Sequence, residues 1–444
     1  MNQFLSEEIA VCREHAPLDA CVKGMPGLIG SVAMADVAKQ GWNVLREDLP
    51  LPLAVIRQDA MLHNSDWMRR FLQERGSLFA PHGKTTMSPQ LFDLQRRDGA
   101  WGITVATCHQ VQVARAFGTR RIVLANQLVG RQSVAYILEA LREDPGFDFY
   151  CLVDDPEHVT ALAHAVRQAD IGRPLQVLLE VGYEGGRTGC RDDTSVRAVI
   201  DALAQVRPYL ALRGIEGFEG LIKPLPDKNV EVRIEEFLAR MVDTVGICER
   251  LNLFAEGPIL LSAGGSSFYD LVTRHLASEN LSQGHMVLTR SGCYLTHDSH
   301  IYKDAFARIQ QRSPEVGSLG QGLIPALEVW GYVQSRPESQ KVIINLGKRD
   351  ISPDHMPLAT GWYRPGTQGY GTDGAAISSL AAGHEVTGLD DQHCHMQVPA
   401  DSPLRIGDMV CFGISHPCLT FDKWEALMIV DDRYDVVGAV RTYF

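Results

Sequence analysis

Residues 146–183, GFDFYCLVDDPEHVTALAHAVRQADIGRPLQVLLEVGY, contain two β-rich runs separated by one helical stretch. Phe147–Asp154 and Leu175–Tyr183 are short, mostly apolar runs of the kind that form buried strands. Between them, His158–Gln168 repeats apolar residues at helical spacing. A strand, a helix and a further strand in this order predict a βαβ unit, whose two strands are parallel.

The same alternation extends outward to about residue 50 and about residue 300. The β-rich runs are Leu53–Ile56, Ser77–Ala80, Trp101–Thr107, Arg121–Gln127, Phe147–Asp154, Leu175–Tyr183, Leu210–Glu219, Pro258–Gly265 and His285–Gly292. The helical stretches include Asp59–Arg75, Gln110–Phe117, Ser133–Arg142, His158–Gln168, Ser195–Val206, Val232–Arg250 and Phe268–Leu276. About eight or nine such units in roughly 250 residues predict an α/β protein with a TIM-like (β/α)8 barrel.

The alternative to the barrel is an open doubly wound sheet, which usually carries a Gly-rich turn after its first strand. Here the run Leu53–Ile56 is followed by Arg57-Gln58-Asp59-Ala60. The barrel is therefore favoured.

Beyond about residue 300, helical periodicity gives way to short β-rich runs separated by glycine, proline and aspartate. The runs are Leu327–Gln334, Lys341–Leu346, Glu385–Gly388, Met409–Phe412 and Trp424–Val430. The predicted organisation is an N-terminal extension over residues 1–45, a barrel over 46–300 and a mostly β domain over 301–444.

The composition excludes several classes of protein. The chain has 444 residues, of which 45% are hydrophobic, and its formal net charge is -12. This acidic balance argues against a general nucleic-acid binder and against binding to an anionic membrane surface. The sequence shows no signal peptide and no apolar run long enough for a membrane helix. The 10 cysteines are scattered, so we expect reduced thiols in a cytoplasmic protein.

Lys84 lies in Ala80-Pro81-His82-Gly83-Lys84-Thr85, directly after a predicted strand. A lysine that a turn holds just past a short strand is suited to form a Schiff base with a carbonyl cofactor. Most lysines are exposed and inert, however, so the interpretation depends on what the other strand ends carry.

Barrel enzymes have their active sites at the C-terminal ends of the strands. One predicted strand ends in Gly264-Gly265-Ser266-Ser267 before a helix, where backbone N–H groups are able to bind a phosphate. Another ends in a Gly-rich turn that carries Arg187. Glycines can also do no more than turn the chain. A lysine at one strand end and a phosphate-binding turn at another, taken together, predict a site for pyridoxal phosphate.

His416-Pro417-Cys418 follows a predicted strand of the C-terminal domain. In an extended segment alternate residues share a face, and imidazole with thiolate is a ligand pair for zinc or a similar divalent ion. A second cluster, Asp390 to His395, includes His393. An isolated His-x-Cys is more often a buried histidine and a buried thiol than a metal site. Two protein ligands suit an open catalytic metal rather than a closed structural one.

These segments together resemble the D-serine dehydratase and D-threonine aldolase family. Its members are fold type III pyridoxal phosphate enzymes with an alanine-racemase-like barrel and a β domain. The resemblance covers the chain from about residue 50 to the end. It is carried by Pro81-His82-Gly83-Lys84-Thr85, Gly102–Thr107, Arg187-Thr188-Gly189, Gly264-Gly265-Ser266, Arg290–Tyr294 with Asp298, Gln392-His393 and His416-Pro417-Cys418.

The resemblance implies a role for each of these residues. Lys84 binds pyridoxal phosphate and moves the proton at Cα, and a homodimer is expected. The implied cofactor ligands are Arg187 at the pyridine nitrogen and Gly264, Gly265, Ser266 and Tyr294 at the phosphate. His416 and Cys418 are expected to bind a divalent metal, zinc being favoured, with His393 close by as a base or a supporting residue.

The implied activity is dehydration of a D-3-hydroxy amino acid, above all D-serine, to pyruvate and ammonia. Dehydratases of the family resemble this chain in having His-x-Cys, whereas the aldolases have His-x-Asp, so Cys418 favours dehydration over retro-aldol cleavage. An amino acid racemase would share the fold but has no use for a metal. A non-catalytic cofactor carrier would lack the C-terminal domain. A metal-dependent hydrolase is disfavoured because His82, His109 and His297 are too isolated to bind one ion.

Overall fold

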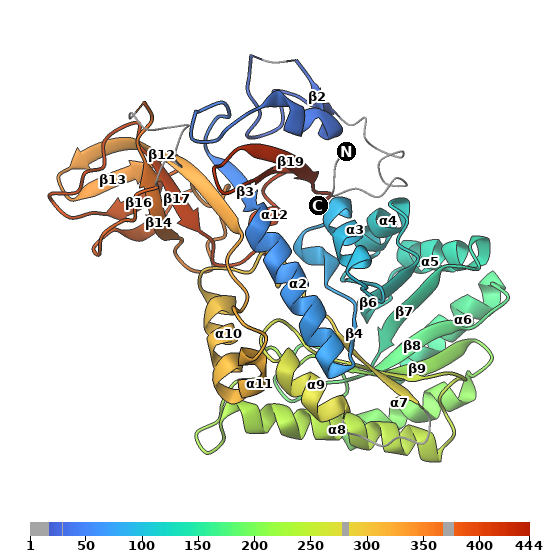
Figure 1. Cartoon of the computed structure of the whole chain (residues 1–444). Helices are drawn as coiled ribbons and strands as arrows, with labels where there is room; N and C mark the ends of the chain where they lie inside the picture. Colours follow the sequence, from blue (N-terminus) through green and yellow to red (C-terminus); the bar gives the residue numbers. More distant parts are fainter. Residues whose placement is uncertain (1–16, 29, 278–283, 367–376) are drawn as a thin grey trace.

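The computed structural model describes residues 17–28, 30–277, 284–366 and 377–444. Its central feature is an eight-stranded sheet in which every pair of neighbouring strands is parallel, in the order β4-β11-β10-β9-β8-β7-β6-β5. A parallel bridge between His82 and Thr104 joins the two ends of this order. Thr104 donates its N–H to the carbonyl of Pro81 over 3.0 Å. The sheet is therefore closed, which confirms the predicted barrel (Figure 1).

The barrel strands are β4 (Leu78–Phe79), β5 (Ile103–Val105), β6 (Arg121–Gln127), β7 (Asp148–Val153), β8 (Leu175–Val181), β9 (Leu210–Gly217), β10 (Ile259–Ser262) and β11 (His285–Thr289). The helices that connect them are α3 (Pro89–Arg97), α4 (Cys108–Ala116), α5 (Arg131–Glu143), α6 (Pro156–Ala169), α7 (Asp193–Gln205), α8 (Val230–Arg250) and α9 (Tyr269–Ala277). Each of the eight strands overlaps one of the β-rich runs of the sequence.

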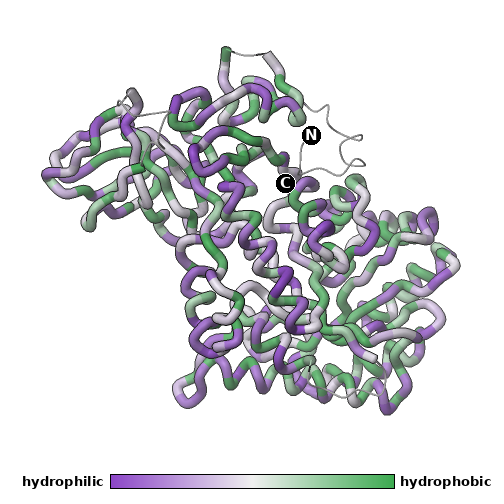
Figure 2. The backbone as a smooth tube through the Cα atoms, viewed as in Figure 1, coloured by the Kyte–Doolittle hydropathy of each residue, from purple (hydrophilic) through white to green (hydrophobic). Residues whose placement is uncertain are grey.

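The two-residue period of the strands separates the inside of the barrel from the outside. On β8, Leu178 belongs to a small cluster with side chains of other barrel strands, while Val177 and Leu179 belong to a large cluster shared with the surrounding helices. Because both faces of a parallel barrel strand are buried, such strands are apolar along most of their length. Figure 2 shows this as green strands within a barrel whose helices are partly purple.

The predicted first barrel strand belongs to a different sheet. β3 (Leu53–Arg57) pairs antiparallel with β12 (Leu327–Glu338) and parallel with β18 (Ala426–Val430). The barrel begins only with β4, after α2 (Gln58–Arg75), so the barrel strands do not start at the predicted boundary near residue 46. A short run that is buried on both faces has the same composition in either sheet, so the sequence pattern does not distinguish the two positions.

The C-terminal domain contributes eight strands to a nine-stranded, mainly antiparallel sheet in which β3 is the ninth. The other strands are β13 (Lys341–Ile344), β14 (Leu358–Tyr363), β15 (Glu385–Leu389), β16 (Cys394–Gln397), β17 (Met409–Gly413) and β19 (Val436–Arg441). Two helices, α10 (Ile301–Arg312) and α11 (Pro314–Gly317), precede these strands, so the prediction that helical structure ends near residue 300 is wrong by about one helix.

α2 and α10 lie between the barrel and the C-terminal sheet (Figure 1). Trp67 of α2 stacks on Phe71, and its ring meets the edge of Phe306 of α10 at a centroid distance of 5.1 Å. These side chains share one buried cluster with Trp424 and Leu427 of the C-terminal domain. Apolar packing therefore fixes the barrel against the second sheet.

The described part of the N-terminal extension packs on the C-terminal sheet. It forms a short hairpin of β1 (Pro17–Leu18) and β2 (Val32–Ala33), followed by the 3-10 helix η1 (Met34–Gln40). Leu18 and Val37 are buried in one cluster with Trp330 of β12. No helix among the described residues is long and apolar enough to cross a membrane.

Gly214 is the barrel position where an added side chain would fit least well. It pairs with Leu260, and a Cβ at residue 214 would lie 1.9 Å from the carbonyl oxygen of Leu260. We expect Gly214→Ala to lower stability by roughly 2–3 kcal/mol, because backbone rather than a flexible side chain must move. The matched control Gly246→Ala lies inside helix α8, where the same change should stabilise by about 0.5–1 kcal/mol.

Thermal unfolding of the two variants would measure the difference. A midpoint several degrees lower for Gly214→Ala, with no fall for Gly246→Ala, is the expected result. Equal midpoints would show that β9 and β10 can separate at this register without cost.

Candidate functional site

The predicted cofactor residues lie at the C-terminal ends of the barrel strands. Lys84 follows β4, Arg187 follows β8, and Gly264 with Gly265 follows β10. The loop from Arg290 to Cys293 follows β11, which is the neighbour of β4 in the sheet. Parallel strands place all these ends on one rim of the barrel, which is where barrel enzymes bind their substrates.

Lys84 lies in a single 3-10 turn, Gly83–Thr85, that the backbone fixes at both ends. Thr85 donates its N–H to the carbonyl of His82 over 3.2 Å, and Met87 donates to the carbonyl of Gly83 over 2.8 Å. The lysine side chain is half-buried. This is an anchored and accessible amine, as a Schiff-base lysine requires.

The surroundings of Lys84 are electropositive. Burial lowers the pKa of His82 well below its usual value, and the cations of Lys84, Arg290 and Arg187 lower it further. Nδ1 of His82 is buried and has no hydrogen-bond partner among the described residues. A neutral histidine with a free ring nitrogen and three nearby cations fits an anionic ligand beside Lys84.

A layer of buried carboxyl groups, to which the sequence patterns assign no role, lies beneath this rim. Glu216 of β9 forms an ion pair with Arg290, which also donates to the carbonyl of Gly217 over 2.9 Å. Glu180 of β8 accepts hydrogen bonds of 2.6 Å from Gln127 and from Thr188. Burial raises the pKa of Glu216 to about 7 even though Arg290 acts in the opposite direction. A glutamate within an otherwise apolar strand was the available signal.

The predicted phosphate-binding turn holds an internal carboxylate in this structure. The N–H groups of Gly264 and Gly265 donate to the two oxygens of Glu219, over 3.1 and 2.9 Å. The N–H groups that the sequence predicts for a phosphate are therefore occupied by a buried side chain in this structure. Ser266 and Ser267 follow at the start of the segment that leads into α9 and are half-buried.

The other two predicted cofactor ligands have different surroundings. Arg187 is exposed, and its guanidinium lies 4.9 Å from the ring centre of Phe218. Tyr294 is buried in the hydrophobic cluster, where its ring meets the edge of Phe79. Arg187 thus stays near the rim, whereas the contacts of Tyr294 are those of a core residue and give no support to its predicted role.

His416 and Cys418 are brought together with a third residue, Cys293, from the barrel. One ligand atom from each of the three lies within 4.8 Å of the others. The two sulfurs are 3.8 Å apart, and Cys418 lies 3.3 Å from the hydroxyl of Thr85. Cys293 is not recognisable as a ligand from the sequence, because it is 125 residues from Cys418.

Electrostatics within this cluster favour a deprotonated thiol. The pKa of Cys418 is lowered well below its usual value because Cys293 and His416 stabilise its thiolate. Burial would lower the pKa of His416, but Cys418 and Asp354 raise it to about 9. The carboxylate of Asp354 accepts a hydrogen bond of 2.7 Å from Nδ1 of His416. Two thiols and an oriented imidazole form a group that could hold a metal ion.

His393 does not join this cluster. It is exposed in the turn between β15 and β16, where its carbonyl accepts the N–H of Asp390. Its predicted role as a base near the metal stays a prediction. All the cysteines that the structure describes are free thiols.

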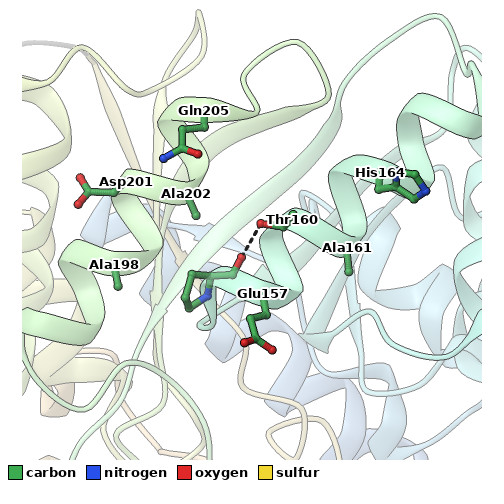
Figure 3. Close-up of a pocket in the computed structure, with 9 residues that line it drawn as sticks. Glu157, Thr160, Ala161, His164, Ala198, Asp201, Ala202 and Gln205 are labelled. Carbon is green, nitrogen blue, oxygen red and sulfur yellow. Dashed lines mark hydrogen bonds between the residues drawn. The ribbon is translucent and has the colours of Figure 1, made fainter.

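Two surface hollows lie apart from these residues. The first, of about 670 Å³, is a groove between α6 and α7 that contains His164 and Asp201 (Figure 3). The second, of about 590 Å³, is lined by several cations including Lys23 and Lys423. Neither contains a residue of the Lys84 turn or of the thiol cluster.

Comparison with known families agrees with this architecture. Residues 56–246 match the family described as "Alanine racemase, N-terminal domain", and residues 326–430 match the "Putative serine dehydratase domain". Each of these matches covers less than half of the chain, and both agree with the family that the sequence resembles. The sequence resemblance is thereby confirmed.

One curated relative is the D-threo-3-hydroxyaspartate dehydratase of Delftia sp. (strain HT23). It is 31% identical over 153 residues, which are 34% of this chain and 39% of the relative. The sequence match therefore spans well under two thirds of that protein.

Solved structures resemble nearly the whole chain. The D-threonine aldolase of Filomicrobium marinum superposes with a TM-score of 0.71 at 19% identity and covers 90% of this chain and 97% of the aldolase. The D-threo-3-hydroxyaspartate dehydratase of Delftia sp. HT23 gives a TM-score of 0.66 at 20% identity and covers 90% and 99%. At this identity the likeness establishes the fold.

Glu216 gives a testable pH dependence. A carboxyl group whose pKa rises on folding, here to about 7, stabilises the protein below its unfolded pKa, and this contribution is lost as the pH rises through 7. The unfolding free energy of the wild type relative to Glu216→Gln should therefore fall by about 2–3 kcal/mol between pH 5 and pH 8.

Urea denaturation of both proteins at several pH values measures this difference. The exposed Glu184 provides the control, since Glu184→Gln should show no such change relative to the wild type. Parallel profiles for wild type and Glu216→Gln would mean that Glu216 is ionised throughout the range.

Proposed function

We propose that the protein is a pyridoxal phosphate- and metal-dependent dehydratase of D-3-hydroxy amino acids, which converts D-serine to pyruvate and ammonia. The observation that carries the proposal is the position of Thr85. It follows Lys84 directly, and its hydroxyl lies 3.3 Å from Cys418. The turn that carries the amine predicted to bind the cofactor therefore also contacts the thiol predicted to bind the metal.

The residues around Lys84 fit pyridoxal phosphate. Lys84 would bind its carbonyl, and the unpartnered Nδ1 of His82 is available to one of its polar groups. The hydroxyls of Ser266 and Ser267 would receive the phosphate, together with the N–H groups of Gly264 and Gly265, which would then exchange Glu219 for the phosphate. When bound, the cofactor supplies an electron sink that acidifies the Cα proton of the amino acid.

Lys84 is then the residue that removes the Cα proton. The exposed guanidinium of Arg187 would attract the carboxylate of the substrate to the same rim. His416 and Cys418 would hold the divalent ion, which supplies Lewis acidity for a hydroxide leaving group. The carboxylate of Asp354 orients the imidazole of His416, as the partners behind metal-bound histidines usually do.

Of the activities that similar proteins carry, the curated relative supports dehydration. The curated relative is itself a dehydratase of a D-3-hydroxy amino acid, and one of its solved structures is a cysteine variant in a metal-free form. 3-Hydroxyaspartate is accordingly a second candidate substrate. Retro-aldol cleavage is the alternative reaction, favoured by the likeness to D-threonine aldolase.

The cofactor assignment is tested by absorbance. Wild-type protein incubated with pyridoxal phosphate and desalted should retain visible absorption, whereas Lys84→Ala should lose it because no amine remains to bind the carbonyl. The exposed Lys223 provides the control, and Lys223→Ala should keep the absorption. Retention of the same spectrum by Lys84→Ala would exclude Lys84 as the cofactor lysine.

The reaction is tested by product analysis with D-threonine, with and without a chelator. Metal-dependent formation of 2-oxobutanoate and ammonia is expected, because hydroxide leaves poorly without a Lewis acid. Glycine with acetaldehyde would make the protein an aldolase despite Cys418. Formation of L-threonine or L-allo-threonine would make it a racemase or an epimerase.

A further inference from the structure

The distance between Cys293 and Cys418 matches one particular metal geometry. Two sulfurs, each about 2.3 Å from a tetrahedral Zn²⁺, lie about 3.8 Å apart. The sulfurs of Cys293 and Cys418 are 3.8 Å apart, and the ligand atom of His416 completes the group within 4.8 Å. Ligands around an octahedral Mg²⁺ lie about 2.0–2.1 Å from the ion, so neighbouring ligands are only about 3 Å apart.

Cys293 is held in this position by the loop that precedes it. Ser291 donates its hydroxyl to the carbonyl of Gly265 over 3.0 Å, and Arg290 is anchored by its ion pair with Glu216. Gly292 packs against the Lys84 turn so closely that a Cβ there would lie 2.5 Å from the hydroxyl of Thr85. The Cys293 backbone therefore has little freedom to move its sulfur away from Cys418.

The three side chains come from both parts of the molecule. Cys293 follows barrel strand β11, whereas His416 and Cys418 follow β17 of the C-terminal sheet. Tyr302 of α10 is a neighbour of this cluster, because its ring meets the edge of the imidazole of His416. The cluster is thus supported from the barrel, the sheet and the helix between them.

The bond that Asp354 accepts from His416 assigns the nitrogens of the imidazole. Nδ1 donates to Asp354, so Nε2 is the nitrogen that would bind a metal, with loss of its proton. Thr85 lies 3.3 Å from the sulfur of Cys418 and 3.9 Å from that of Cys293, within range of weak bonds to both. Each of the three ligand side chains therefore contacts a further polar residue that orients it, as metal ligands in proteins generally do.

We propose that Cys293 is a third protein ligand, so that Cys293, His416 and Cys418 form a Cys₂His site that selects Zn²⁺ over Mg²⁺ and Mn²⁺. The inference deepens the proposed function, which requires only His416 and Cys418. Thiolates and imidazole favour zinc, whereas magnesium and manganese favour oxygen ligands. Three ligands leave one tetrahedral position open, which is the arrangement of catalytic zinc sites and the position where a substrate hydroxyl would bind.

Cobalt absorption tests the number of thiolates without reference to catalysis. The full-length protein, freed of metal under reducing conditions, is titrated with Co²⁺, whose thiolate charge-transfer band grows with each sulfur bound. The band of Cys293→Ser should fall to about half that of the wild type, because one of two thiolates is removed. Cys108→Ser, at a half-buried thiol outside the cluster, should leave the band unchanged.

Zinc affinity provides the second readout. Competition with a chromophoric chelator should show Cys293→Ser binding Zn²⁺ about 10- to 100-fold more weakly, with the preference for Zn²⁺ over Mn²⁺ reduced. An unchanged cobalt band and an unchanged zinc affinity in Cys293→Ser would overturn the proposal.

A measurement on the wild type covers the case in which Cys293→Ser does not fold. X-ray absorption of the zinc-loaded wild type should show two sulfur neighbours at about 2.3 Å, and one sulfur neighbour would overturn the proposal. These outcomes are separate from the proposed activity. Two sulfurs with no dehydratase turnover would contradict the function alone, whereas chelator-sensitive dehydration with one sulfur would contradict the role of Cys293 alone.

Discussion

The hydrogen bonding of β3 between β12 and β18 is the constraint on which the rest of the structure depends. β3 precedes the whole barrel in sequence, yet it lies inside the sheet built by the end of the chain. Because α2 continues directly from β3, the start of the barrel is tied to the C-terminal sheet. The chain then completes the barrel and returns to the same sheet through α10. The buried cluster of α2, α10 and the sheet fixes the angle between the two parts.

That constraint produces the candidate site. Thr85 and Cys418 are 333 residues apart, but the Lys84 turn and the segment after β17 meet where the barrel rim faces the C-terminal sheet. A thiol cluster with one residue from the barrel and two from the sheet can exist only if the two parts keep a fixed relation. Zinc bound there would in turn hold the two parts together, so metal binding and domain packing would reinforce each other.

The charged side chains at the rim also hold neighbouring loops together. Glu216 pairs with Arg290, and Glu219 occupies two backbone donors of Gly264 and Gly265. These contacts fix the loops after β9, β10 and β11 relative to one another before any ligand binds. The buried ion pair is costly in itself, but removing one partner would leave a buried charge alone. The guanidinium of Arg187, which is exposed, would remain available for a phosphate or a carboxylate.

The sequence by itself determined the elements and the residue types of the site. The alternation of strands and helices predicted the barrel, and the position of Lys84 after a strand predicted its place on the rim, because these are local consequences of periodicity and turn chemistry. The sequence did not determine that β3 joins the second sheet, since an apolar strand buried on both faces suits either one. It also did not show that Glu219 occupies the Gly264–Gly265 turn or that Cys293 meets Cys418. Those pairings depend on contacts between distant segments, and only the packing of the two parts of the molecule decides them.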